Sequence, residues 1–178
     1  MANLKKDFLK SFEKNIFIEA GTHKGDSVMV AIDSGFKKIY SCEPAIGRYN
    51  FCKERFKDEI NSGLVVLEPK SSLDFFKQIL PDLNEGAIFW LDSHKDDNSQ
   101  GLESLPPCPI ISEIKLISEY GAKGHVLLID DIRIFGNLGW GRNITVDQIK
   151  QELKAIDNNC EFYFVDGYTK NDVLVCEF

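Results

Sequence analysis

Short apolar runs that alternate with segments of helical spacing constrain this chain most. The apolar runs lie at 15–20, 38–43, 63–68, 87–92 and 125–130, and their length and composition are those of strands buried on both faces. Helical spacing follows each run, at 27–34, 45–57, 71–80, 109–120 and 145–157, and Leu4, Phe8 and Phe12 suggest one more amphipathic helix in front. This alternation predicts a parallel sheet with helices on both faces.

The end of the chain departs from this pattern. Two further apolar runs, at 160–165 and 172–178, are joined only by "DGYTKN", which is too short for a crossover helix and suits a hairpin. The predicted fold class is therefore α/β, a Rossmann-like doubly wound seven-stranded sheet that is mostly parallel with an antiparallel last strand. No linker divides the sequence, so we expect residues 1–178 to form one domain.

Composition narrows the classes of function. The chain has 178 residues, 43% of them apolar, and a formal net charge of −7, which opposes a broad electrostatic hold on nucleic acid or an anionic membrane. Its five cysteines are widely spaced and odd in number, as expected of reduced thiols in the cytoplasm. No segment resembles a signal peptide or reaches membrane-spanning length. We expect a soluble cytoplasmic protein that acts on a small molecule.

The motif "EAGTHKGDS", residues 19–27, links the first apolar run to the first helix. Gly21 permits a sharp turn, Gly25 permits a close approach to a ligand, and the helix amino terminus offers unpaired N–H groups. The spacing differs from the Gly-x-Gly-x-x-Gly of dinucleotide binders, which disfavours an NAD-dependent oxidoreductase. Glu43 ends the second run, where an acid is placed to accept two ribose hydroxyls. These features indicate a nucleoside with a positive or zwitterionic tail.

With these motifs the sequence resembles the class I S-adenosylmethionine-dependent methyltransferases. "EAGTHKGDS" is similar to the first glycine motif of that family, "SCEP" to its ribose-binding acid, and the closing hairpin to its antiparallel seventh strand. The resemblance implies that S-adenosylmethionine is the cofactor. It also implies a set of cofactor contacts, which are Glu19, Gly21, Gly25, Glu43, Ser71, Ser72 and Asp92. Ser71 is equally well explained as a helix N-cap.

Three aspartates follow the fourth and fifth apolar runs. Asp92 ends "FWLD", and Asp130 and Asp131 end "LLIDD". Because neighbouring strands lie about 4.8 Å apart, acids at two adjacent strand ends can converge on one cation, and carboxylate oxygens suit Mg²⁺. Each aspartate on its own is also explained as a cap of the following loop. The pattern therefore predicts a site for Mg²⁺ or a similar divalent ion.

The same segments resemble the metal-dependent O-methyltransferases of the catechol, caffeoyl-CoA and macrolide-sugar types. This resemblance implies methyl transfer to a hydroxyl oxygen of a small molecule, with Asp92, Asp130 and Asp131 as metal ligands. In the catechol type a lysine three residues after the first metal acid is the base, and Lys95 stands in that place. His94 is the alternative base, because its ordinary pKa of about 6.5 needs no large shift.

The closure of the site and the chemistry itself stay open at this point. Only about 15 residues precede the first strand, so the acceptor must be covered by the loops at 93–108 and 131–144 or by a second subunit in a homodimer. In the second loop Phe135, Trp140 and Arg142 can form a wall over the acceptor, or Trp140 can pack on the sheet edge. A metal-independent methyltransferase and a non-catalytic nucleoside-binding module are the alternatives.

Overall fold

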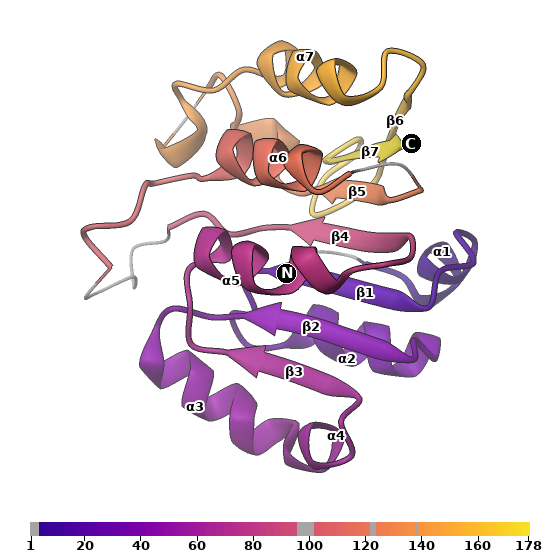
Figure 1. Cartoon of the computed structure of the whole chain (residues 1–178). Coiled ribbons are helices and arrows are strands. Elements are labelled where there is room, and N and C mark those ends of the chain that lie inside the picture. The colour runs from indigo at the N-terminus through magenta and orange to yellow at the C-terminus, as the bar shows by residue number, and fades with distance from the viewer. Residues whose placement is uncertain (1–3, 96–101, 122–123, 138) are drawn as a thin grey trace.

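One mixed sheet organises the protein (Figure 1). The structure is a computed structural model that describes residues 4–95, 102–121, 124–137 and 139–178. Its strands are β1 (Ile16–Ala20), β2 (Lys38–Cys42), β3 (Val65–Glu68), β4 (Ala87–Leu91), β5 (Val126–Ile129), β6 (Glu161–Val165) and β7 (Val173–Glu177). They lie in the order β3-β2-β1-β4-β5-β7-β6. All pairings from β3 to β5 are parallel, and β7 runs antiparallel to both β5 and β6, so the predicted fold class is confirmed.

Helices cover both faces of the sheet. They are α1 (Lys6–Lys10), α2 (Asp26–Ser34), α3 (Ile46–Arg55), α4 (Lys57–Asn61), α5 (Ser72–Ile79), α6 (Ile110–Glu119) and α7 (Val146–Ile156). Side chains alternate along each strand: Ile18 of β1 belongs to the core under α5, α6 and α7, whereas Phe17 belongs to the core under α1, α2 and α3. Figure 1 shows α5 and α6 in front of the sheet and α2 behind it. Both cores therefore require strands that are apolar on both sides.

Side-chain caps mark where two helices, α5 and α7, begin. The Thr145 hydroxyl accepts from the Gln148 N–H at 3.1 Å while the Gln148 side chain accepts from the Thr145 N–H at 2.8 Å, a capping box that starts α7. The sequence did not predict α4, which follows α3 after a single residue, Phe56. Parts of both predicted long loops, residues 96–101 and 138, lie outside the described residues. The second loop contains the 3₁₀ turns Ile132–Ile134 and Gly139–Gly141.

The topology gathers the predicted functional residues at one edge of the sheet. Strand β1 pairs in parallel with β2 on one side and with β4 on the other. The order of the strands therefore reverses at β1, and a crevice opens beyond the carboxyl end of β1. Gly21, Glu43, Ser71, Asp92 and Asp130 all follow the carboxyl ends of the strands β1 to β5. The strand order thus brings five separated segments together.

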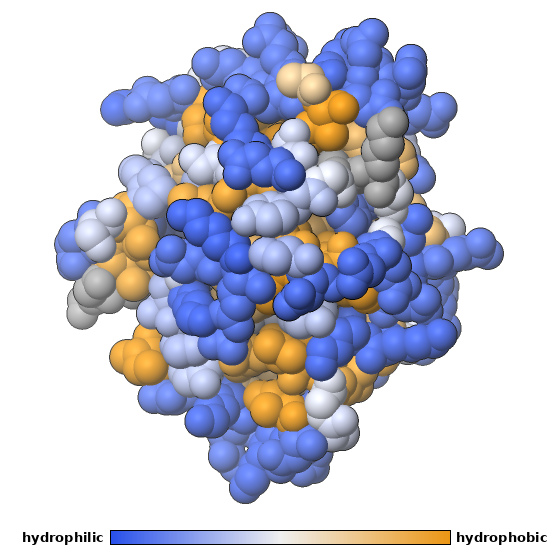
Figure 2. All heavy atoms as spheres, in the orientation of Figure 1, coloured by the Kyte–Doolittle hydropathy of each residue, from blue (hydrophilic) through white to orange (hydrophobic). Residues whose placement is uncertain are grey.

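The face of the molecule seen in Figure 2 is mostly polar. Figure 2 shows hydrophilic residues over most of the visible face, with scattered apolar patches between them. In the described parts of the chain, no helix has the length and apolar character needed to cross a membrane.

His125 offers a test of how the amino-terminal ends of β4 and β5 are joined. Its Nδ1 accepts a hydrogen bond from the Ala87 N–H at 3.0 Å, and the residue is buried. Burial and the nearby Lys14 charge lower the pKa of His125 to about 4. The unfolded chain therefore takes up a proton on this residue near pH 6.5 while the folded chain does not, so the free energy of unfolding falls as the pH drops from about 6.5 towards 4.

We expect His125→Asn to remove this contribution, because asparagine retains an acceptor near the position of Nδ1 but does not titrate. The difference in free energy of unfolding between wild type and variant should shrink by roughly 2–3 kcal/mol between pH 7.5 and pH 4.5. Denaturant titrations at the two pH values measure it. If the difference in free energy of unfolding between wild type and variant is the same at both pH values, the lowered pKa of His125 is contradicted.

Candidate active site

The turn after β1 is built around two glycines in left-handed backbone conformation. Gly21 has φ +96°, and a Cβ there would lie 2.5 Å from the Asp92 carbonyl oxygen. Gly25 has φ +81°, and a Cβ there would meet the Phe56 ring at 2.4 Å. Gly21 thus lets β1 and β4 exit side by side, whereas Gly25 makes room for Phe56, the residue at the end of α3. The role of Gly25 shown by the structure is packing.

Glu19 lies underneath this turn. Its carboxylate accepts from the Ser41 hydroxyl at 2.6 Å and from the Ser27 hydroxyl, and the side chain is fully buried. Burial raises its pKa to about 7 against the lowering effect of the two serines. The structure places Glu19 where it fastens the start of α2 to β2, below the surface that a ligand would contact.

Glu43 presents its carboxylate at the end of β2. One oxygen accepts from the His23 N–H at 2.8 Å and the other from the Ala45 N–H at 2.9 Å, and only 3% of the residue is exposed. These two backbone donors orient the carboxylate.

The serines after β3 have structural partners as well as a place at the site. Ser71 is the N-cap of α5, and its hydroxyl accepts from the Asp74 N–H at 3.2 Å. Ser72 is hydrogen-bonded to Glu113, a buried acid of α6 that also accepts from the Ser93 hydroxyl. Burial raises the pKa of Glu113 to about 7. Glu113 escaped the sequence analysis, although an acid between Ile110, Ile114 and Ile117 on an apolar helix stripe was a usable signal.

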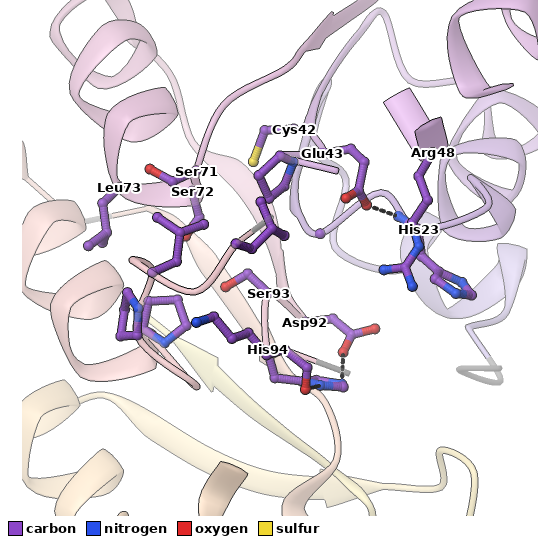
Figure 3. A pocket seen from close by; sticks show the side chains of 17 residues that line it. His23, Cys42, Glu43, Arg48, Ser71, Ser72, Leu73, Asp92, Ser93 and His94 are labelled. Carbon is purple, nitrogen blue, oxygen red and sulfur yellow. Dashed lines mark hydrogen bonds and ion pairs between the residues drawn. The ribbon is translucent and has the colours of Figure 1, made fainter. Parts of the chain in front are cut away.

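A cleft lies against these groups (Figure 3), and we call it the glycine-turn cleft. It encloses about 670 Å³ of empty space, including space open to solvent, within the range of small-molecule sites. Its lining comes from all strand ends between β1 and β4 and consists of Gly21, His23, Cys42, Glu43, Pro44, Arg48, Ser71, Ser72, Leu73, Asp92, Ser93, His94, Lys95, Leu102, Leu105, Pro106 and Pro109. Figure 3 shows Ser71 and Ser72 at the left, Glu43 and Arg48 at the right, and Asp92 and His94 below them.

A second cleft adjoins the first, and we call it the aspartate cleft. All described residues that line it carry polar or charged side chains, and they are His23, Asp26, Ser27, Asp92, His94, Asp130, Asp131, Arg133 and Tyr168. His23, Asp92 and His94 line both clefts. The two spaces therefore meet at the carboxyl end of β4.

His94 joins two of the predicted metal acids. Its Nε2 lies 3.2 Å from an Asp92 oxygen and 3.2 Å from an Asp131 oxygen. Burial disfavours the charged imidazole, but the hydrogen bonds to Asp131 and Asp92 outweigh it and raise the pKa of His94 to about 10. His94 thus lies between the two carboxylates, where its protonated ring is favoured.

The predicted trio of Asp92, Asp130 and Asp131 divides into two groups. Among the described residues, donor atoms within 4.8 Å of one another are found in Asp92, His94 and Asp131, and in Asp130, Asp131 and Asp172. Asp131 belongs to both groups. It has φ +59°, a left-handed conformation that costs energy for any residue but glycine and is tolerated best by Asn and Asp.

Asp130 is a buried acid with one carboxylate oxygen that has no hydrogen-bond partner among the described residues. The residue is 5% exposed, and its Oδ1 is buried without a hydrogen-bond partner in the part of the chain that the structure describes. Burial first, and then the charges of Asp92 and Asp131, raise the pKa of Asp130 to about 8. An orphaned buried carboxylate oxygen beside two further acids fits a divalent cation.

Arg133 and Asp172 balance the far side of the aspartate cleft. The Arg133 guanidinium lies 2.6 Å from an Asp131 oxygen and also contacts the carboxylate of Asp172, which is buried. The same guanidinium stacks on the ring of Tyr168, 4.9 Å from its centre, and 67% of Tyr168 is exposed. Sequence analysis missed Asp172 and Tyr168, since only the antiparallel β6–β7 hairpin carries them to this edge.

The two candidate bases occupy different positions. His94 lies between the acids, whereas the Lys95 side chain lines the glycine-turn cleft and its Nζ donates to the Glu103 carbonyl at 3.3 Å. Trp140 stacks flat on His94 with ring centres 4.0 Å apart and planes 10° apart, and Phe135 packs against the Trp140 edge. Of the predicted aromatic wall, Trp140 and Phe135 thus stand at the site, and Arg142 is exposed.

The strand order, the single reversed strand and the glycine turn define the class of fold: it is that of the class I S-adenosylmethionine-dependent methyltransferases. A candidate rRNA methylase from Clostridium thermocellum superimposes with a TM-score of 0.65 at 14% identity, over 96% of this chain and 92% of that one. S-adenosylhomocysteine-bound methyltransferase PaMTH1 from Podospora anserina gives 0.63 at 14% identity, over 97% and 75%. A candidate caffeoyl-CoA O-methyltransferase from Staphylococcus aureus gives 0.62 at 10% identity, over 96% and 78%.

Sequence comparison adds nothing to this likeness. No protein-family model and no curated protein matches the chain. Because these three structural neighbours are only 10–14% identical to this chain, their likeness confirms the fold that the sequence resemblance implied and nothing beyond it.

Gly21 and Gly35 provide a matched test of the turn. Both have positive φ, +96° and +84°, but only at Gly21 does a Cβ meet other atoms, whereas Gly35 faces open space. We expect Gly35→Ala to lose roughly 1–2 kcal/mol of unfolding free energy from backbone strain, and Gly21→Ala to lose clearly more because the Asp92 backbone must move. Equal losses in denaturant titrations would show that the close approach of β1 and β4 is unimportant.

Proposed function

We propose that this protein transfers a methyl group from S-adenosylmethionine to a hydroxyl oxygen of a small molecule, with the assistance of a divalent cation. S-adenosylmethionine would occupy the glycine-turn cleft, and the acceptor would occupy the aspartate cleft. The observation that carries the proposal is that these two clefts meet at Asp92 and His94. A methyl donor and an acceptor bound on either side would face each other there.

The glycine-turn cleft suits the donor. Glu43 lines this cleft at the end of β2, and two backbone N–H groups orient its carboxylate, which supports a role in binding ribose hydroxyls. Ser71 and Ser72 line the cleft, where their hydroxyls would contact the base. Methyltransferases of the same fold have been solved with S-adenosylhomocysteine or S-adenosylmethionine bound. Glu19 would act from beneath by holding the turn that Gly21 and Gly25 shape.

The aspartate cleft suits the cation. Asp92, Asp130 and Asp131 would hold it, and the unpartnered Oδ1 of Asp130 supports this assignment. A bound divalent ion supplies Lewis acidity, which lowers the pKa of a hydroxyl and fixes its position. Arg133 would keep Asp131 ionised and oriented, since the guanidinium and His94 lower the pKa of Asp131 despite its burial.

Lys95 and His94 are the candidates for removing the acceptor proton. His94 is already bound to two carboxylates. Lys95 follows Asp92 by three residues and lines the glycine-turn cleft, and its Nζ donates to the Glu103 carbonyl rather than to these acids. This arrangement favours Lys95 as the base.

Two alternatives keep the same fold. A metal-independent methyltransferase would use the imidazolium of His94 to neutralise Asp92 and Asp131 permanently. A non-catalytic nucleoside-binding module would need only the glycine-turn cleft. The buried Oδ1 of Asp130, which has no partner among the described residues, favours the metal-dependent reaction over both. An RNA acceptor, as the name of one neighbour suggests, is disfavoured by the net charge of −7 and by the acids around the aspartate cleft.

A comparison of variants at Glu43 and Glu68 distinguishes a loss of cofactor binding from the general effect of removing an acid. Both end neighbouring strands, but only Glu43 lines the glycine-turn cleft, whereas Glu68 pairs with Lys70 at 3.6 Å. We expect Glu43→Gln to weaken S-adenosylhomocysteine binding at least about tenfold, because an amide sets an NH₂ against one of the two backbone donors. Glu68→Gln should bind like wild type. Calorimetric titration measures both, and equal affinities for the two variants would contradict the assignment of Glu43.

Metal removal tests the reaction. We expect a chelator, or Asp130→Asn, to abolish release of S-adenosylhomocysteine from a panel of small diphenols and methyl glycosides, because the acceptor hydroxyl loses its acidification. Affinity for S-adenosylhomocysteine should stay within about threefold of wild type. The exposed acid Asp147 of α7 is the control, and Asp147→Asn should keep full activity. Turnover that persists after chelation would support the metal-independent alternative.

A further inference from the structure

We infer that the imidazole of His94 is itself a metal ligand, so that the resident ion is a first-row transition cation such as Mn²⁺, Fe²⁺ or Co²⁺ rather than Mg²⁺. The inference rests on the proposed function, because it concerns the cation of the same site. It changes the donor set from three carboxylates to Asp92, His94 and Asp131, with Asp130 beside them.

The geometry of the donors carries this inference. Nε2 of His94 lies 3.2 Å from Asp92 Oδ1 and 3.2 Å from Asp131 Oδ2, and the three donor atoms belong to one group within 4.8 Å. Figure 3 shows the His94 ring directed at Asp92 from the segment that follows β4. Two carboxylates and one imidazole thus converge on one point from two adjacent strand ends.

The second ring nitrogen of His94, Nδ1, has a hydrogen-bond partner that suits a metal-binding imidazole. Nδ1 of His94 lies 3.1 Å from the Lys95 carbonyl oxygen, and since a carbonyl can only accept, Nδ1 carries the proton. In the neutral ring Nε2 then has the lone pair that faces the acids. Histidine ligands of metals characteristically donate their second N–H to such a carbonyl, which fixes the tautomer and the ring orientation.

Trp140 holds the plane of the ring. Its indole stacks on His94 with centres 4.0 Å apart and planes 10° apart, and Phe135 supports Trp140 from its edge at 5.4 Å. An imidazole fixed by stacking and by a backbone hydrogen bond loses little freedom when it binds an ion. Trp140 is therefore a positioning residue of the site.

A second, independent observation concerns Asp130, which lines the same cleft and whose donor atoms group with those of Asp131 and Asp172. Asp130 is 95% buried, as its exposed fraction is 5%, and its Oδ1 has no partner among the described residues. Asp131, the neighbouring acid, keeps a left-handed backbone with φ +59°. An unpaired buried carboxylate oxygen next to a strained ligand residue is the arrangement expected of a binding site and not of a surface cap.

The donor set decides which ions fit. Mg²⁺ prefers oxygen ligands and dehydrates reluctantly. Imidazole nitrogen suits later first-row ions such as Fe²⁺, and the affinity of a mixed nitrogen and oxygen site rises from Mn²⁺ through Fe²⁺ to Co²⁺. With His94 as a ligand, the proton of the acceptor must be removed by another group, which leaves Lys95 as the base.

The test compares three ions on the full chain. Protein stripped with a chelator is titrated separately with Mg²⁺, Mn²⁺ and Co²⁺ by calorimetry, for wild type, His94→Gln and His23→Gln. Glutamine replaces the nitrogen donor by an oxygen donor of similar reach, whereas His23 lines both clefts but belongs to neither donor group. Affinity for S-adenosylhomocysteine is measured on the same samples as a check of folding.

We expect wild type and His23→Gln to bind Mn²⁺ and Co²⁺ at least about 100-fold more tightly than Mg²⁺, and His94→Gln to reduce this preference at least about tenfold. The visible absorption of bound Co²⁺ should also change in His94→Gln, because a nitrogen ligand is lost. An unchanged preference in His94→Gln, or no binding of any of the three ions, would overturn the inference. If wild type does not bind S-adenosylhomocysteine, the proposed function itself would be refuted instead.

Discussion

The parallel pairing of β1 with β2 on one side and β4 on the other is the constraint on which the rest of the site depends. It places Gly21 against the Asp92 backbone so closely that a side chain at Gly21 has no room. It also sets Glu43 and Asp92 on either side of the turn. Since β5 follows β4 in the sheet, Asp130 and Asp131 arrive next to Asp92. Without this strand order the two clefts would not share a boundary.

Concentrating acids at that edge is electrostatically costly, and the protein offsets the cost in different ways for different acids. Glu19 and Glu113 are buried with serine donors, and burial raises the pKa of each to about 7. Asp131 is held ionised by His94 and Arg133, and Asp172 is paired with Arg133. Only Asp130 keeps a buried oxygen without a partner among the described residues. This unequal treatment separates acids that support the fold from those that are available for a ligand.

Much of the fold could be predicted because its signals are local. Buried parallel strands must be continuously apolar, and the predicted strands agree with the observed ones within about two residues at each end. The caps at Ser71 and Thr145 mark helix starts by hydrogen bonds to residues three positions away. The helix α4 was missed, because five residues with no buried member carry no apolar pattern. The predicted ligand contacts stay predictions, and the structure adds that Glu19 has hydrogen-bonding partners and Gly25 a packing partner within the protein.

The sequence by itself determined the α/β alternation, the terminal hairpin and the placement of acids and glycines at strand ends, since each depends on residues close together in the chain. Only the tertiary structure decided which of these ends meet. His94 and Asp131 are 37 positions apart, yet the neighbouring ends of β4 and β5 bring Nε2 and a carboxylate oxygen to 3.2 Å. Trp140 reaches His94 from a loop, and Asp172 reaches Arg133 from the hairpin. Such contacts follow from strand order and packing, which no local pattern encodes.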